Sequence, residues 1–144
     1  MSENKEKNPW QLKKLVLPQH TDHAGVMWHG SYLNWLEEAR INAISSVGLE
    51  YKDISNAGFE MPVVELKVRY LFPIFNGAEV TLESFFSIGK GPRWRFDTNF
   101  IQDSSKLVAI AHVDLVVINK NSFSVIRKKP DYISNALINL QKGP

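Results

Sequence analysis

A 3.6-residue repeat of apolar positions predicts one long helix in the first third of the chain. The repeat covers roughly residues 31–47, and the apolar residues of its main face are Tyr32, Trp35, Leu36, Ala39, Ala43 and Val47. Ser31 is suited to cap the N-terminus of this helix, and Gly48 is suited to end it. Three more apolar residues fall outside that face: Leu33, Ile41 and Ile44. The helix is therefore expected to be an element around which a sheet wraps.

From residue 61 onward the apolar period changes to two, which is typical of strands. The first predicted strand is residues 64–70, in which apolar and charged residues alternate as in a half-buried strand. The others are residues 79–88, 94–102 and 107–118, with a further short one at 123–126. An earlier β-rich run, residues 10–17, is stopped by Pro18, and a short helix from Pro130 to about Leu140 closes the chain. This order predicts an α+β fold with an antiparallel sheet of about five strands. One helix covers only part of such a sheet, so we expect a free face or edge to pair with another subunit.

The charge of the chain is balanced overall and uneven along its length. The 144 residues carry 17 Lys+Arg and 15 Asp+Glu, a net charge of +2, which is too balanced for a general nucleic-acid-binding protein. Residues 90–129 hold 8 basic and 3 acidic side chains, or +5. This section could bind a small polyanion, and it could equally be a solvated charged surface.

The composition also removes several chemical classes. The chain has no cysteine, which excludes disulfides, thiolate catalysis and thiolate metal sites. It has no apolar run of the roughly 18 residues that span a bilayer. Residues 1–8 are polar and are predicted to be a flexible arm, followed by a single domain at 9–144. We therefore expect a cytoplasmic protein without a membrane partner.

The segment before the predicted helix gathers most of the candidate chemistry. It reads His20-Thr21-Asp22-His23-Ala24-Gly25-Val26-Met27-Trp28-His29-Gly30-Ser31-Tyr32. A helix N-terminus carries unpaired N–H groups and the positive end of the helix dipole, so it can polarise a carbonyl and stabilise an oxyanion. Asp22 could attack that carbonyl or activate water. A purely structural interpretation is also open, in which Asp22 caps a turn and the glycines let the chain bend.

The same residues carry a resemblance to a known family. The pattern Thr21-Asp22-x-Ala24-Gly25-Val26-x-x-x-Gly30-x-Tyr32-x-x-Trp35-x-Glu37-x-Ala39-Arg40 is similar to the start of hot-dog-fold acyl-CoA thioesterases of the 4-hydroxybenzoyl-CoA thioesterase type. The order of strand, helix and four strands agrees over nearly the whole chain. The resemblance implies a hot-dog fold, in which the sheet wraps around one long central helix. It also implies hydrolysis of an acyl-CoA thioester without metal or other cofactor.

The resemblance assigns roles to individual residues. Asp22 matches the catalytic carboxylate, which acts as nucleophile or general base, and the backbone N–H of His29 matches the oxyanion donor. Gly25, Gly30 and Tyr32 match motif positions beside the substrate, and Trp28 is a further candidate for substrate contact. One position departs from the family, because His20 stands where many members have a first acid. The role of that acid is therefore not transferred.

Other side chains offer rival interpretations. Glu37 and Glu38 lie on the predicted helix, where another branch of hot-dog thioesterases keeps its acid, although Glu37 also pairs naturally with Arg40. The three histidines of the segment invite a metal interpretation, but their spacing fits no standard site.

Coenzyme A carries several phosphate charges, which call for cations near the pocket. We expect Arg127, Lys128 and Lys129 to contact them, with Arg93 and Arg95 as the alternative pair. In both places a solvated charged surface is the competing interpretation.

The four tryptophans favour an aromatic acyl group, such as 1,4-dihydroxy-2-naphthoyl-CoA or 4-hydroxybenzoyl-CoA. A short aliphatic acyl-CoA is the alternative within the same reaction, and a non-catalytic acyl-CoA-binding hot-dog domain is the alternative from another class. We further expect a homo-oligomer, in which dimers assemble to a tetramer.

Overall fold

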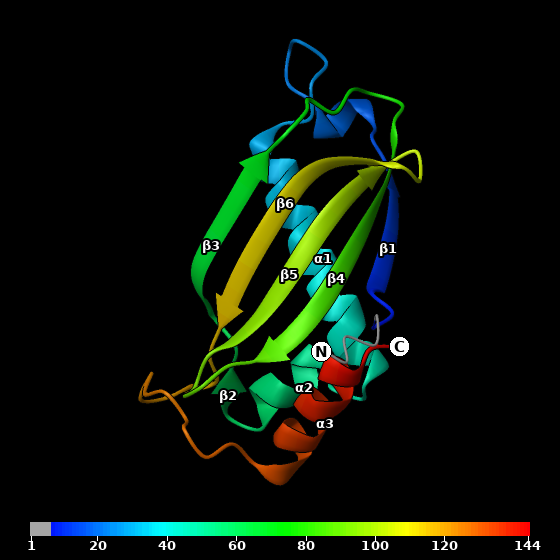
Figure 1. The fold of residues 1–144 in the computed structure, drawn as a ribbon. Coiled ribbons are helices and arrows are strands. Elements are labelled where there is room, and N and C mark those ends of the chain that lie inside the picture. Colours follow the sequence, from blue (N-terminus) through cyan, green and yellow to red (C-terminus); the bar gives the residue numbers. More distant parts are fainter. Residues whose placement is uncertain (1–6) are drawn as a thin grey trace.

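The computed structural model describes residues 7–144, and five of its strands form one antiparallel sheet (Figure 1). The order across the sheet is β1–β4–β5–β6–β3. The strands are β1 Trp10–Leu15, β3 Val63–Tyr70, β4 Glu79–Ile88, β5 Trp94–Gln102 and β6 Lys106–Leu115. β1 and β3, which precede and follow the long helix, form the two opposite edges of the sheet. The α+β prediction with about five strands is thus confirmed, and it is a hot-dog architecture.

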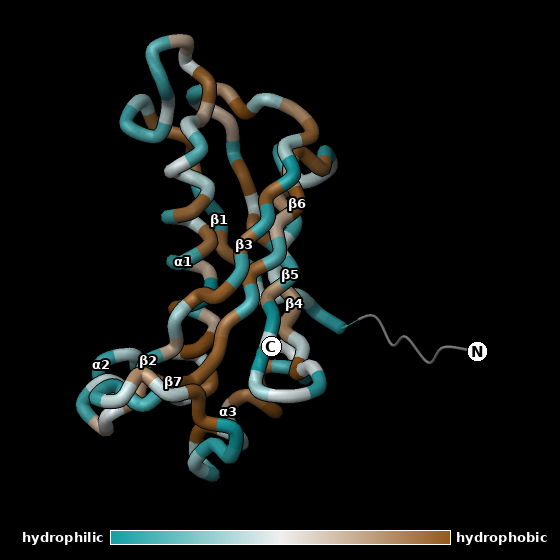
Figure 2. The backbone as a smooth tube through the Cα atoms, turned by 90° about the vertical axis from the view of Figure 1, so that its left-hand side faces the viewer, coloured by the Kyte–Doolittle hydropathy of each residue, from teal (hydrophilic) through white to brown (hydrophobic). Residues whose placement is uncertain are grey.

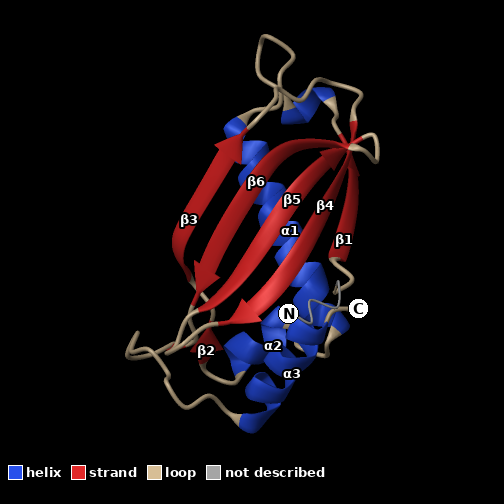
Figure 3. Ribbon diagram, in the orientation of Figure 1, coloured by secondary structure: helices blue, strands red, loops and turns tan. Residues whose placement is uncertain are grey.

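Two helices pack on the same side of this sheet. The long helix α1 (His29–Ser46) crosses its concave face, and α3 (Asp131–Lys142) packs at the lower end against β4 (Figures 1 and 3). Figure 2 shows the sheet from the side of β3, with α1 on one side only. The opposite sheet face has no helix over it among residues 7–144. Its side chains are accordingly more polar than those facing α1.

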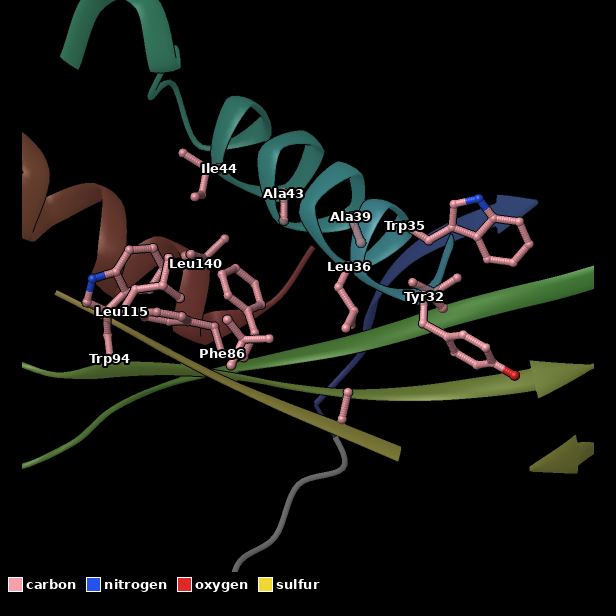
Figure 4. Close-up of a cluster of buried hydrophobic side chains, with 14 of the residues drawn as sticks. Tyr32, Trp35, Leu36, Ala39, Ala43, Ile44, Phe86, Trp94, Leu115 and Leu140 are labelled. Carbon is pink, nitrogen blue, oxygen red and sulfur yellow. The ribbon is translucent and has the colours of Figure 1, made fainter. Parts of the chain in front are cut away.

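The hydrophobic core lies between α1, α3 and the sheet (Figure 4). The buried residues of α1 are Ser31, Tyr32, Trp35, Leu36, Ala39, Ala43 and Ile44. This is the predicted face, with Ile44 in place of the half-buried Val47. Leu33 and Ile41 stay exposed, because they lie on the side of α1 that faces away from the sheet.

On the opposite face of the sheet, Asp114 is buried and held by arginine. The Arg95 guanidinium donates from Nε to Asp114 Oδ1 over 2.6 Å and from a terminal nitrogen to Oδ2 over 3.1 Å. Arg93 bridges Asp114 and Glu65. The hydrogen bond from Arg95 holds the pKa of the Asp114 carboxyl below its usual range. Both arginines are therefore engaged by carboxylates of the sheet, which disfavours the expectation that they contact CoA phosphates.

The observed boundaries correct several predictions. α1 begins at His29, two residues before the predicted start, and Ser31 does not cap it: its hydroxyl donates to the His20 carbonyl over 2.9 Å. The predicted strand 107–118 ends at Leu115. Residues 123–126 form no strand, because Phe123 has a left-handed φ of 56° that interrupts the extended chain. The structure adds η1 Pro18–His20, α2 Tyr51–Asn56 and the short pair β2 Phe59–Glu60 with β7 Ile118–Asn119.

β3 is a free edge with an unusual surface. The sequence predicts a half-buried strand, but nearly every position of β3 is exposed, because no strand covers its outer edge. Exposed apolar side chains continue along β3 and the segment after it; this β3 edge strip consists of Val63, Val64, Leu66, Tyr70, Leu71, Phe72 and Phe75. Several exposed apolar side chains beside unpaired strand hydrogen-bonding groups are typical of an interaction site.

Two other sequence predictions concern the N-terminal arm and membrane-spanning segments. Residues 1–6 of the predicted N-terminal arm lie outside the described residues. Within residues 7–144, no helix combines the length and the apolar character needed to cross a bilayer.

Candidate active site

Residues 20–28 form a tight hairpin that leads directly into α1. The Trp28 N–H donates to the His20 carbonyl over 2.9 Å, and the Asp22 N–H donates to the Val26 carbonyl over 2.8 Å. Gly25 turns the tip with a φ of 77°, a conformation that favours glycine. The second strand is anchored by the Met27 N–H, which donates to the Ile74 carbonyl over 2.7 Å, and by the buried Met27 side chain. The hairpin is thus fixed to the body of the protein.

Asp22 lies at the exposed tip of the hairpin, with its two carboxylate oxygens in different situations. Oδ1 accepts hydrogen bonds from the backbone N–H groups of Ala24, over 2.8 Å, and Val26, over 3.3 Å. Oδ2 has no hydrogen-bond partner within residues 7–144. The turn-capping and the chemical interpretations of Asp22 therefore apply to different atoms of one side chain. Oδ1 shapes the loop, and Oδ2 is free to react.

Asp22 lies opposite Val26 in the hairpin, and Trp28, the last residue before α1, follows two residues after Val26. The start of α1 is therefore about 7 Å from Asp22 along the hairpin. His29 is the first residue of α1, and its N–H has no acceptor in the described part of the chain. Side chains alternate along paired strands, so Asp22 and Trp28 project to the same side of the hairpin. An exposed carboxylate oxygen and an unpaired helix N–H therefore lie at one end of the molecule.

Trp28 and Gly30 shape the surface around that N–H. Trp28 is 48% exposed, and its ring lies 5.0 Å from the ring of His29. A Cβ at Gly30 would fall 2.1 Å from the Trp28 ring, so glycine is what allows the indole to lie across the start of the helix. This packing places an aromatic surface beside the predicted oxyanion donor. Trp28 therefore lies exposed at the start of α1, and its contact with substrate stays a prediction.

His20 has a structural position that the sequence does not predict. Its Nδ1 accepts a hydrogen bond from the Leu17 N–H over 3.0 Å, and its ring packs edge-on against Trp35 at 5.2 Å. The His20 carbonyl accepts from both Trp28 and Ser31. His20 thus ties the hairpin to α1, and within the described residues it makes no hydrogen bond to Asp22.

An apolar pocket of about 320 Å³ lies directly beside the hairpin. Its lining residues are Val26, Met27, Tyr32, Tyr70, Leu71, Phe72 and Pro73, none of them charged. Val26 connects the pocket to Asp22, because the Val26 N–H donates a hydrogen bond to Asp22 Oδ1. Burial, and then the neighbouring Tyr70, raise the pKa of Tyr32 to about 12. The pocket thus has apolar walls and a protonated phenol, and one of its lining residues, Val26, is hydrogen-bonded to Asp22.

The rival acids on α1 are placed less favourably. Glu38 forms an ion pair with Lys14, with 3.0 Å between Oε2 and Nζ. Glu37 is exposed two turns along α1 from His29, about 12 Å from the helix start. Burial lowers the pKa of Arg40, and the Glu37 carboxylate partly offsets this by raising it. Among residues 7–144 no three potential metal-binding side chains cluster together.

The predicted phosphate-binding cluster lies far from Asp22 within one chain. Arg127, Lys128 and Lys129 follow β7 at the lower end of the molecule, whereas the hairpin lies at the upper end (Figure 1). α1, which runs between these ends, has 18 residues and is about 27 Å long. One copy of the chain therefore does not bring the cluster to its own Asp22.

Comparisons with known proteins agree with this architecture. Residues 16–137 match the family described as the thioesterase-like superfamily. A protein of Synechocystis sp. that is provisionally named as an esterase, sll0410, is 29% identical over 134 residues, which cover 92% of this chain and 81% of that protein. The 1,4-dihydroxy-2-naphthoyl-CoA hydrolase of Thermosynechococcus vestitus is 31% identical over 74 residues, 49% of this chain and 51% of the hydrolase. The crystal structure of DHNA-CoA thioesterase from Staphylococcus aureus superimposes with a TM-score of 0.81 at 27% identity, covering 91% of this chain and 89% of that one.

Proposed function

Since the chain belongs to the thioesterase-like superfamily and is an acyl-CoA thioester hydrolase, we propose that Asp22 and the backbone N–H of His29 are its catalytic groups. The observation that carries this proposal is that the two carboxylate oxygens of Asp22 differ in their hydrogen bonding. One oxygen is held by the hairpin and the other is free, at the same end of the molecule as an unpaired helix N–H. Asp22 belongs to a hairpin that is anchored at Met27, and this hairpin leads directly into α1, whose first residue is His29.

In the proposed reaction, the thioester oxygen accepts a hydrogen bond from the His29 N–H. The positive end of the α1 dipole there stabilises the negative charge that develops on this oxygen. Asp22 Oδ2 attacks the carbonyl carbon, or it removes a proton from a water molecule that attacks instead. The carbon–sulfur bond breaks and its electron pair leaves on the sulfur of CoA. In the first route water then hydrolyses the acyl-aspartate anhydride, so both routes give free acid and CoA. Neither route needs a cofactor.

The acyl group is proposed to be aromatic and to occupy the pocket beside the hairpin. The pocket walls are apolar, and two of its residues are tyrosines. Two similar proteins are named for 1,4-dihydroxy-2-naphthoyl-CoA, a two-ring aromatic thioester. The volume of about 320 Å³ falls at the lower end of ordinary ligand pockets, which suits one or two rings better than a long alkyl chain.

We also propose that the working unit is a homodimer joined through β3, which further pairing would extend to a tetramer. The exposed apolar residues in the first half of β3, Val63, Val64 and Leu66, would be covered, while Tyr70, Leu71 and Phe72 would still line the pocket. The unpaired backbone groups of β3 would bond to the β3 of a second copy. A two-fold axis through the middle of β3 makes the two strands antiparallel. The upper end of each copy then lies beside the lower end of the other.

This arrangement gives the basic cluster a place in the site. In the antiparallel pair, Arg127, Lys128 and Lys129 of one copy lie beside the Asp22 hairpin of the other. We therefore propose that the three cations bind the phosphates of a CoA molecule whose thioester lies at the second copy's Asp22. We propose that the enzyme is located in the cytoplasm, because its substrate is an acyl-CoA and its chain has no cysteine.

The test is a panel of acyl-CoAs assayed for thiol release. The panel contains 1,4-dihydroxy-2-naphthoyl-CoA, 4-hydroxybenzoyl-CoA, benzoyl-CoA, acetyl-CoA and hexanoyl-CoA. We expect the largest kcat/KM for an aromatic member and a much lower rate for the Asp22→Asn variant with the same substrate. Binding of all members with no thiol release would instead identify a non-catalytic acyl-CoA-binding domain. A largest kcat/KM for acetyl-CoA or hexanoyl-CoA would contradict the aromatic assignment.

A further inference from the structure

Tyr70 occupies an unusual position for a tyrosine at the end of an edge strand. It is the last residue of β3, and its register with Ala109 places its side chain on the α1 side of the sheet. Its ring meets the ring of Tyr32 edge-on, with 4.9 Å between the centres. Tyr70 is nevertheless 54% exposed, whereas Tyr32 is 2% exposed. Tyr70 therefore packs on the core with one edge and leaves the rest of its ring facing the pocket.

The two tyrosine hydroxyls are polar groups without internal partners. Within residues 7–144 neither hydroxyl makes a hydrogen bond, in contrast to Tyr51, whose hydroxyl donates to Glu60 over 3.1 Å. Figure 4 shows the Tyr32 ring directed away from the remaining labelled residues of the core, with its hydroxyl at the far end. Since both residues line the pocket, their hydroxyls are available to a group that enters it.

The other walls of the pocket restrict what that group can be. Val26, Met27, Leu71 and Phe72 offer only apolar surface, and Phe72 is held by the Lys106 ammonium, which lies 4.0 Å from the centre of its ring. An ionised acyl group, such as a carboxylate, would lose its hydration without gaining a charged partner from the lining. Neutral aromatic groups gain ring contacts with Tyr70 and Phe72. A hydroxyl on such a ring would supply the polar partner that the tyrosine hydroxyls lack.

We propose that Tyr70 is a specificity-determining residue that selects acyl groups carrying a neutral, hydroxylated aromatic ring. Its ring contacts the aromatic ring of the acyl group, and its hydroxyl forms a hydrogen bond with the ring hydroxyl. This inference rests on the proposed function, because it takes the pocket as the acyl site. It goes beyond that function by assigning the choice of acyl group to one residue of the free edge strand.

The test compares the binding of two CoA thioethers that cannot be hydrolysed, 4-hydroxyphenacyl-CoA and phenacyl-CoA, which differ by one ring hydroxyl. Isothermal titration calorimetry of the wild-type chain should give at least fivefold tighter binding of the hydroxylated compound. Tyr70→Phe should reduce that ratio about fivefold, as expected for one net hydrogen bond. Tyr70→Leu, which also removes the ring, should weaken both compounds by a further threefold or more. The matched control is Tyr132→Phe, the same change at an exposed tyrosine of α3, which should leave the ratio unchanged.

Each outcome bears on a separate claim. An unchanged ratio in Tyr70→Phe, or no preference in the wild-type chain, overturns the role of Tyr70 even if acyl-CoA hydrolysis proceeds. Failure of the wild-type chain to hydrolyse any acyl-CoA refutes the proposed function, yet a preference that falls in Tyr70→Phe would still support the pocket assignment. Failure of both thioethers to bind the wild-type chain refutes the inference as well.

Discussion

Replacing Asp22 by asparagine and by alanine separates the two functions of its carboxylate. Asparagine keeps an oxygen that can accept from the Ala24 and Val26 N–H groups, and it removes the negative charge of the free oxygen. Alanine removes both. We therefore expect Asp22→Asn to keep the hairpin and lose the reaction, and Asp22→Ala to lose the reaction and weaken the hairpin while leaving the fold intact.

The size of the stability effect follows from the two hydrogen bonds. Each net hydrogen bond contributes about 0.5–1.5 kcal/mol, and the lower end applies here because Asp22 is exposed and water can replace it. Asp22→Ala should therefore lower the free energy of unfolding by about 1 kcal/mol, which corresponds to a fall in Tm of about 3 °C for a domain of this size. Asp22→Asn should change the Tm by less than about 1 °C. Calorimetric or fluorescence melting measures both.

The effect on catalysis should be much larger and should not distinguish the two variants. Loss of a nucleophile or general base lowers kcat by at least about 100-fold, so both variants should release thiol from the best acyl-CoA at or below that level. Asp131→Asn is the matched control, because it makes the same charge change at the start of α3 and should keep the wild-type rate. Wild-type turnover by Asp22→Asn would refute the reasoning and make Glu37 the next acid to test. A Tm for Asp22→Asn as low as that of Asp22→Ala would refute the structural role of Oδ1.

Three further predictions concern the rest of the molecule. Reversing the charges of the cluster at 127–129 to glutamate should raise KM for acyl-CoA at least tenfold with little change in kcat, and an unchanged KM in steady-state assays would remove the cluster from the site. Because the folded pKa of Asp114 lies below its unfolded value, its stabilising effect is complete at neutral pH and is lost as the pH falls through the folded pKa. Denaturant titrations from pH 6 to pH 2.5 should therefore show a steeper loss of stability for the wild-type chain than for Asp114→Asn, and parallel curves would contradict this. Leu66→Asp on the free edge β3 should dissociate the dimer in sedimentation experiments, whereas Leu15→Asp on the other edge strand should not; a dimer that survives Leu66→Asp would contradict the pairing.

The sequence predicts the elements whose pattern repeats over many residues. The strands at 79–88 and 94–102 are observed with the predicted bounds, and the buried face of α1 is nearly the predicted one, because a long period averages over local exceptions. The short elements α2, β2 and β7 are missed, since two to six residues carry no measurable period. β2 and β7 depend on each other across almost sixty residues of chain. Contacts of that kind leave no local signal.

In the candidate site too, residues of a local sequence motif are predicted, whereas residues brought together from distant parts of the chain are not. Asp22 and His29 are proposed from a motif, and the structure puts Asp22 in a hairpin that leads into the helix whose first residue is His29. The second wall of the pocket is not predicted, because Tyr70, Leu71 and Phe72 lie in a stretch that fits the family resemblance without being assigned a role. The available signal for a substrate pocket there is the pair of aromatic residues Tyr70 and Phe72, close together in the sequence. The structural role of His20 is also missed, since its partners are the Leu17 backbone and the Trp35 ring rather than a neighbouring side chain in sequence.

The separation of Asp22 and the basic cluster to opposite ends of α1 has a genetic consequence. In the proposed antiparallel pair of subunits, each site would take its acid from one chain and its cations from the other. A mixed pair, in which one chain lacks the acid and the other lacks the cations, would contain one doubly defective site and one intact site. Alleles that inactivate the two ends would therefore complement each other, whereas two alleles of the same end would not.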